Sequence, residues 1–195
     1  MKRTEILTSL LPSLAWLVPI IVCEPISFVL MLLSAITIHE CGHAFAFFIT
    51  RTPAPRLSGT HAGLLLTPKA QLSYKSELII ASMGPAFNLM LAFALIICSK
   101  LSDADALHLL IGVNFSCALC NLLPVFELDG GRILFSLCAL FFSLEAAEKI
   151  KKITTFFVLS LLLFFSLWLI LILDIGYRIL IYAIIIAIAA SKNKR

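Results

Sequence analysis

Apolar residues are gathered into long runs that short polar stretches separate. The runs cover roughly residues 6–22, 26–49, 78–98, 106–144, 153–173 and 176–190. Several of them approach or exceed the about 20 residues that a helix needs to cross a bilayer. The fourth run is too long for one helix, and the proline of Asn121-Leu122-Leu123-Pro124 and the glycines of Asp129-Gly130-Gly131 predict a break in it. The pattern therefore predicts about six transmembrane helices, the fourth of them interrupted.

Composition supports a membrane protein of the all-α polytopic class. Of the 195 residues, 61% are hydrophobic and 13% are charged, and the mean hydropathy is +1.07. A soluble domain is typically about half apolar and about a quarter charged, so a water-soluble fold of this composition would lack polar surface. No small-x-small cleavage site follows the first run, which we therefore interpret as a retained helix. We expect a single domain over residues 1–195.

Basic residues are concentrated in every second polar segment between the apolar runs. They lie before the first run, in residues 51–76, in residues 149–152 and at the end of the chain, whereas the opposite loops carry Glu24, Lys100 with Asp103 and Asp105, and Asp174. The positive-inside rule then places both termini in the cytosol of a multi-pass cell-membrane protein. Exposed aromatics do not interleave with a basic patch, so the lipid bilayer, and not nucleic acid, is the expected surrounding.

The loop of residues 51–76 is rich in proline and glycine. Its piece Ala62-Gly63-Leu64-Leu65-Leu66 is too short to cross a membrane. It could form a re-entrant hairpin, an edge strand that dips into the membrane, or an ordinary surface loop.

The second run contains His39-Glu40-x-x-His43. Residues four apart share a helix face, so both imidazoles can point at one place, and Glu40 lies about 100° round the helix from His39. This spacing is typical of two zinc ligands and a general base. The alternative is that the three side chains are hydrogen-bonding groups between packed helices, but ionisable residues are costly in an apolar helix.

A catalytic zinc needs a third protein ligand, and the sequence offers several. The candidates are Asp129, His61, His108, Glu127 and the cysteines. Asp129 is favoured because it lies beside Gly130 at the expected break, although it could instead cap the helix that follows. Cys117-x-x-Cys120 could be a metal or redox pair, but small buried cysteines in an apolar run favour packing.

Two amides lie at membrane depth, Asn88 in Gly84-Pro85-x-x-Asn88 and Asn121 before the break. An amide in hydrocarbon needs partners, so each could tie helices together or present a donor to a substrate carbonyl. Helix tying is favoured for Asn88, and both alternatives stay open for Asn121.

Together these motifs resemble the site-2 protease family of intramembrane zinc metalloproteases, and more narrowly its compact, sporulation-type bacterial members. The resemblance spans about residues 26–144 and rests on three motifs in order: His39-Glu40-x-x-His43, Gly84-Pro85-x-x-Asn88 and Asn121-x-x-Pro124-x-x-x-Leu128-Asp129-Gly130. It implies a zinc metalloendopeptidase with Zn²⁺ on His39, His43 and Asp129, with Glu40 as catalytic base. It also implies a substrate-positioning role near Asn121, which we extend to Asn88, and a membrane-associated strand, hairpin or loop within residues 51–76. Arg132 matches a position that is often basic in the family, and the resemblance assigns no role to it.

The resemblance implies cleavage of a transmembrane or membrane-associated protein near its cytosolic side. A transcription factor precursor or an anti-sigma factor is the expected substrate class, and a regulatory membrane partner fits the same picture. We expect no inserted PDZ-like domain and no C-terminal sensing domain, and the frequent Asn-Pro start of the third motif is absent. The rival hypotheses are a metal transporter, which would place further ligands along a path, and an inactive scaffold.

Overall fold

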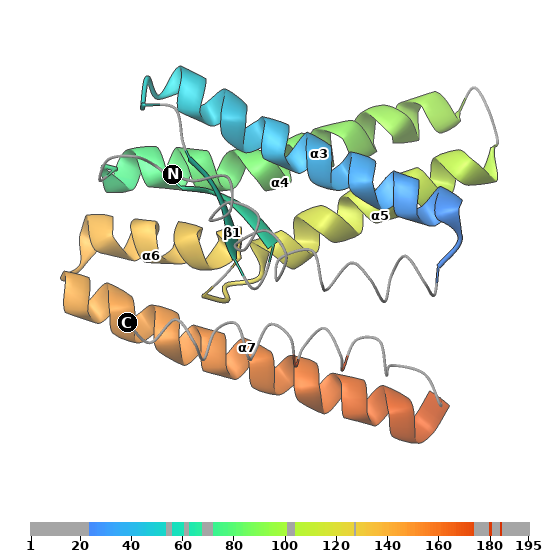
Figure 1. Ribbon diagram of the computed structural model, residues 1–195. Helices are drawn as coiled ribbons and strands as arrows, with labels where there is room; N and C mark the ends of the chain where they lie inside the picture. The colour runs from blue at the N-terminus through green and yellow to red at the C-terminus, as the bar shows by residue number, and fades with distance from the viewer. Residues whose placement is uncertain are drawn as a thin grey trace.

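The computed structural model describes residues 24–53, 56–60, 63–67, 72–100, 104–126, 128–173, 180 and 184. The elements in chain order are α3 (Ile26–Ile49), β1 (Arg56–Thr60), β2 (Gly63–Thr67), α4 (Tyr74–Ser99), α5 (Asp105–Leu122), α6 (Asp129–Phe141) and α7 (Leu144–Leu173) (Figure 1). The predicted helix over 6–22 lies outside the described residues, and so does almost all of the predicted helix over 176–190.

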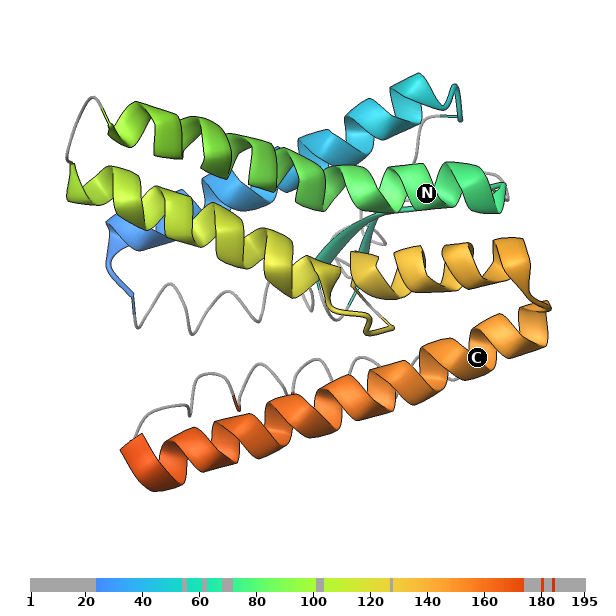
Figure 2. The ribbon, with the colours of Figure 1, turned by 180° about the vertical axis from the view of Figure 1, so that it is seen from behind.

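The helices run roughly along one direction, and α6 continues from the end of α5 (Figures 1 and 2). α4 packs against α3, α5 and α6, and α7 packs against α6. Within the part of the chain that the structure describes, four helices are long and apolar enough to cross a membrane: α3, α4, α5 and residues 144–172 of α7. The short helix α6 is not one of them, and α5 is long enough to cross by itself, so the single interrupted crossing stays a prediction. The chain is therefore a polytopic helical membrane protein.

The predicted break lies between Leu122 and Asp129. The backbone of the break packs against the first turn of α6. A Cβ on Gly130 would lie 2.1 Å from the Leu122 carbonyl oxygen, and a Cβ on Gly131 would lie 2.1 Å from the Val125 carbonyl oxygen. Only glycine can accept such an approach by another backbone. The Gly-Gly pair thus lets the break fold tightly against the start of α6.

α3 and α4 come equally close to each other. A Cβ on Gly42 would lie 2.3 Å from the Met83 carbonyl oxygen. Next to this contact, Ala46, Phe47 and Ile80 form a buried cluster. Small residues at a crossing point let two membrane helices approach closely, and this crossing positions the face of α3 that carries the histidines.

The boundary between α6 and α7 differs from our prediction, which carried the fourth segment to residue 144 and began the fifth at 153. In the structure α6 ends at Phe141, and α7 begins at Leu144 and includes the charged residues 145–152. The Ser143 hydroxyl accepts a hydrogen bond from the Ala146 N–H over 3.3 Å, as an N-cap does. Hydropathy located the apolar part of α7 but not its polar first turns. These turns are helical because Glu and Lys are good helix formers, but their charges give them low hydropathy.

The segment between α3 and α4 contains two antiparallel strands. β1 and β2 pair in the register Arg56↔Thr67 to Thr60↔Gly63. β2 nearly coincides with the piece 62–66 for which the sequence left a strand, a re-entrant hairpin and a loop open.

Candidate metal centre

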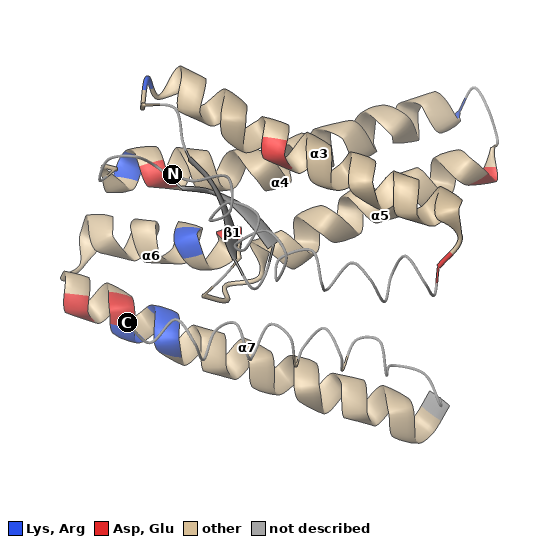
Figure 3. Ribbon diagram, viewed as in Figure 1, with Lys and Arg blue, Asp and Glu red and all other residues tan. Residues whose placement is uncertain are grey.

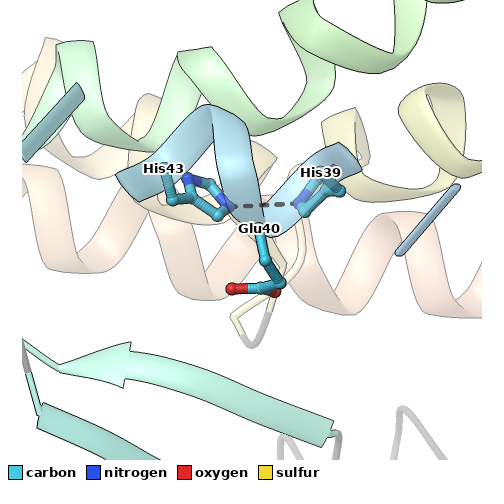
Figure 4. A group of neighbouring side chains, drawn as sticks. All are labelled: His39, Glu40 and His43. Atoms are coloured by element: carbon cyan, nitrogen blue, oxygen red, sulfur yellow. Dashed lines mark hydrogen bonds between the residues drawn. The ribbon is translucent and has the colours of Figure 1, made fainter. Parts of the chain in front are cut away.

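His39 and His43 lie one turn apart on the buried face of α3, each with about 5% of its surface exposed. Their Nε2 atoms are 3.1 Å apart (Figure 4). The rings meet edge to face, at an interplanar angle of 83°. The spacing of four residues therefore does bring the two imidazoles to one point.

Asp129, the first residue of α6, reaches the same point from a position 90 residues further along the chain. Its Oδ2 atom lies 2.9 Å from His39 Nε2 and 3.1 Å from His43 Nε2. Among the other candidate ligands, His108 lies near the start of α5, about 20 Å along that helix from its end next to Asp129. His61 and Glu127 lie outside the described residues.

Nδ1, the second nitrogen of each imidazole, is hydrogen-bonded to an oxygen that acts as the acceptor. His43 Nδ1 donates to the Ile80 carbonyl oxygen over 2.8 Å, and His39 Nδ1 donates to Asn88 Oδ1 over 2.9 Å. A carbonyl oxygen cannot donate, so the proton of each neutral ring sits on Nδ1. Both Nε2 atoms then present lone pairs to the centre.

The Asn88 amide is held in the orientation that this requires. Its Nδ2 donates to the Ala35 carbonyl oxygen over 2.9 Å and to Asn114 Oδ1 over 3.0 Å. Asn114 in turn donates to the Leu110 carbonyl oxygen over 3.0 Å. Asn88 is fully buried, so both of its N–H groups are used inside the protein. Its geometry is that of a group that ties α3, α4 and α5 together and orients His39, and it leaves no donor for a substrate, contrary to the substrate-positioning role we expected.

Three lone-pair atoms thus converge within 3.1 Å of one another, two of imidazole and one of carboxylate. Such atoms repel unless a positive charge lies between them. Tetrahedral zinc with bonds of about 2.0–2.1 Å would separate its ligand atoms by about 3.3–3.4 Å, close to the observed spacing. In its donor types, number and spacing, the set fits a zinc ion with three protein ligands.

Glu40 stands beside this centre and is only partly buried. Its carboxylate and the two histidines offer ligand atoms that all lie within 4.8 Å of one another. In Figure 4 the carboxylate points away from α3, toward the side on which the two strands run. A general base needs this combination of closeness to the centre and access to water.

Gly84 of α4 closes the opposite side of the centre. A Cβ there would lie 2.6 Å from His43 Nε2 and 2.7 Å from His39 Nε2. Because glycine has no side chain, it leaves room for the imidazole edges. This explains why a glycine occupies position 84 in Gly84-Pro85-x-x-Asn88.

Arg132 contacts the third member of the centre. Its Nη1 donates to Asp129 Oδ1 over 2.9 Å, and its Nε donates to Glu77 Oε1 on α4 over 2.8 Å. Glu77 and Asn114 were not predicted from the sequence. For Asn114 the available signal was the same as for Asn88, a lone polar side chain inside an apolar segment. Glu77 lies in the polar stretch just before an apolar run, where a charged residue gives no such signal.

Asn121 lies at the end of α5, next to the break. Its Nδ2 donates to the Cys117 carbonyl oxygen over 3.0 Å, and the side chain is partly buried. Cys117 and Cys120 are free thiols. The substrate-positioning role of Asn121 stays a prediction.

Comparisons with known proteins agree with this geometry. The model of peptidase family M50 matches residues 100–165, which contain Asp129 and Arg132. Stage IV sporulation protein FB of Bacillus subtilis (strain 168) is 25% identical over 173 residues, which cover 85% of this chain and 58% of that protein. These two matches support the resemblance to the site-2 protease family. The chain spans rather more than half the length of that curated relative.

The fold agrees as well. The site-2 protease from Methanocaldococcus jannaschii superposes with a TM-score of 0.70 at 20% identity, covering 96% of this chain and 88% of that one. The membrane-type helices and the similarity to membrane proteases together support a membrane-embedded protein.

Proposed function

We propose that the protein is an intramembrane zinc metalloprotease that cleaves a transmembrane or membrane-associated protein near its cytosolic side. The observation that carries the proposal is the convergence of His39 Nε2, His43 Nε2 and Asp129 Oδ2, with Glu40 alongside. These are the two parts that metal-assisted peptide hydrolysis needs, a three-ligand metal site and a base.

His39, His43 and Asp129 would hold the zinc. A zinc ion in such a site acts as a Lewis acid toward the scissile carbonyl and makes water a stronger nucleophile at neutral pH. Glu40 takes the proton of the attacking water and returns it to the leaving amine. The Nδ1 hydrogen bonds of the two histidines keep both rings in the tautomer that leaves Nε2 free.

The charge distribution supports the orientation. In Figure 3 most of the described Lys and Arg residues lie at the end of the molecule where α3 ends and α4 and α7 begin. By the positive-inside rule this end faces the cytosol. His43 lies six residues before the end of α3 at Ile49, so the cut falls in the cytosolic half of the membrane or just beyond it.

An extended substrate segment is required, because a helix shields its own peptide bonds. We infer that the membrane-associated strands β1 and β2 receive this segment by strand addition, since a two-stranded sheet has two edges. The Asn121 Nδ2 also makes a long contact of 3.7 Å to Cys117 Sγ, a weak acceptor that a substrate carbonyl could replace. Candidate substrates are a transcription factor precursor or an anti-sigma factor, and a regulatory membrane protein could control access. We place the catalytic core at about residues 26–144 of one transmembrane domain.

The decisive experiment compares wild type with Glu40→Gln, purified in detergent. Zinc content is measured by mass spectrometry, and cleavage is measured on a fluorescent single-span peptide with a Gly-Pro-containing segment at its cytosolic end. Glu40→Gln should keep about one zinc per chain and lose about 10²–10⁴-fold in cleavage rate. Glu148→Gln, an exposed change on α7, should match wild type in both measurements.

Three results would contradict the proposal. Cleavage that survives in Glu40→Gln removes the assigned base. Zinc binding without cleavage by wild type, together with zinc flux into proteoliposomes, would favour the transporter. Zinc binding with neither activity would favour the scaffold.

A further inference from the structure

We propose that Arg132, anchored by Glu77, is a positioning residue that restricts Asp129 to binding the metal through one oxygen. The inference rests on the proposed function, since it concerns the third zinc ligand. This role accounts for Arg132 and Glu77, two charged residues that do not take part in the hydrolytic step itself.

The two carboxylate oxygens of Asp129 have different partners. Oδ2 lies within 3.1 Å of both histidine Nε2 atoms, and Oδ1 accepts a hydrogen bond of 2.9 Å from Arg132 Nη1. The side chain of Asp129 is about 7% exposed, so water does not compete freely for either oxygen. The carboxylate is thus divided between the metal centre and the guanidinium.

Arg132 is itself fixed by a second helix. Its Nε donates to Glu77 Oε1 over 2.8 Å, and Glu77 belongs to the first turn of α4. Only 16% of the Arg132 side chain and 24% of the Glu77 side chain are exposed. A guanidinium in such surroundings is stable only when paired, and its planar fork sets the direction of both hydrogen bonds. Arg132 therefore cannot swing away from Asp129 without leaving Glu77 as well.

One-oxygen binding matters because a catalytic zinc needs an open position. A carboxylate that is free to turn can bind through both oxygens and occupy that position. With Oδ1 held by Arg132, only Oδ2 is available to the metal, and the remaining position stays free for water or a substrate carbonyl.

Cobalt(II) in place of zinc reports this geometry directly, because four-coordinate cobalt absorbs visible light far more strongly than cobalt with five or six ligands. The purified protein is stripped of metal and saturated with Co²⁺. Wild type should show the intense band. Arg132→Gln and Glu77→Ala should lose most of its intensity at saturation, because Asp129 can then bind through both oxygens. Glu77→Gln keeps an oxygen acceptor for Arg132 Nε and should retain the band.

Tyr74→Leu provides the matched control. Tyr74 of α4 contacts Phe135 of α6 with ring centres 6.1 Å apart, so this change loosens the same helix pair without touching Asp129. It should keep the band, and thermal unfolding of each metal-free variant shows whether it is folded. Glu77 lies outside the metal centre, so the Glu77→Ala variant still tests the positioning role if Arg132→Gln does not fold.

The outcomes separate the two proposals. If wild type binds no cobalt, the metal site and the proposed function both fail. If wild type shows the band and the folded Arg132→Gln and Glu77→Ala variants show it undiminished, the positioning role is wrong and the metal site stands. The positioning role is also wrong if Tyr74→Leu loses the band as Arg132→Gln does, because the effect is then one of helix packing.

Discussion

α3 and α7 are both long apolar helices, yet they are built into the molecule differently. α7 is the most apolar of the four membrane-type helices, and only 11% of its apolar window is buried, against 28% for α3 and 33% for α4. Among the described elements it packs mainly along α6, and large side chains such as Phe156, Phe164 and Leu171 are exposed. α3 instead presses its backbone against α4 at Gly42, and His39 of α3 is hydrogen-bonded to Asn88 of α4.

The comparison shows that apolar character does not create close packing in a membrane. Lipid is as apolar as leucine, so helices gain little from burying leucine against each other, and small and polar residues decide where they meet. α7 also has a polar tie to the rest of the protein, where Lys151 Nζ lies 3.9 Å from the centre of the Phe126 ring in the break. Four substitutions test this difference, in order of decreasing effect.

Gly84→Ala should abolish metal binding. Its new Cβ would lie within 2.7 Å of both imidazole Nε2 atoms, in the space that the centre needs. Metal content of the purified variant measures the loss. Gly112→Ala on α5 is the control, because a Cβ there meets nothing within 4 Å, and it should keep its metal. A Gly84→Ala protein with a full complement of metal would show that the glycine serves another purpose.

Gly42→Ala should destabilise the α3–α4 pair by about 1–3 kcal/mol, the usual cost of overpacking. The new Cβ would lie 2.3 Å from the Met83 carbonyl oxygen, and a backbone atom inside a helix cannot move aside easily. Reversible unfolding in mixed detergent and SDS measures the change. Gly112→Ala again serves as the control and should be neutral or slightly stabilised, since alanine favours helix more than glycine does.

Asn88→Ala should weaken zinc binding by about 10–100-fold while the protein stays folded, because His39 loses the partner that fixes its ring and tautomer. Competition with a zinc-binding dye measures the affinity. Asn114→Ala removes only the partner of Asn88 and should cost less. Equal losses of zinc affinity in the two variants would mean that Asn88 and Asn114 orient the His39 ring only as a pair.

Leu171→Ala should change the free energy of unfolding by less than about 0.5 kcal/mol. This side chain is 85% exposed on α7, so its surroundings are the same lipid-like medium before and after unfolding within the membrane. The same SDS titration measures it. A cost comparable to that of Gly42→Ala would mean that a further surface covers this face of α7.

Part of the centre was predictable because it is local. His39, Glu40 and His43 lie on one helix, and the helical repeat alone places the two imidazoles together. Pro124 with Gly130 and Gly131 predicts the break by the same local logic, and the structure has it between Leu122 and Asp129. The start of α7 was missed because hydropathy does not register a polar helical turn.

The sequence by itself determined the apolar helices, the interruption and the histidine pair, since each follows from residues within a few turns of one another. Only the tertiary structure decided that Asp129 lies beside the histidines, that Asn88 faces His39 instead of a substrate, and that Glu77 and Arg132 close the far side of Asp129. Apart from the Arg132–Asp129 pair, which lies three residues apart on α6, these contacts join residues between 49 and 90 positions apart. Their pairing depends on how closely α3, α4 and α6 approach, and that distance is set by glycines whose effect appears only when the helices meet.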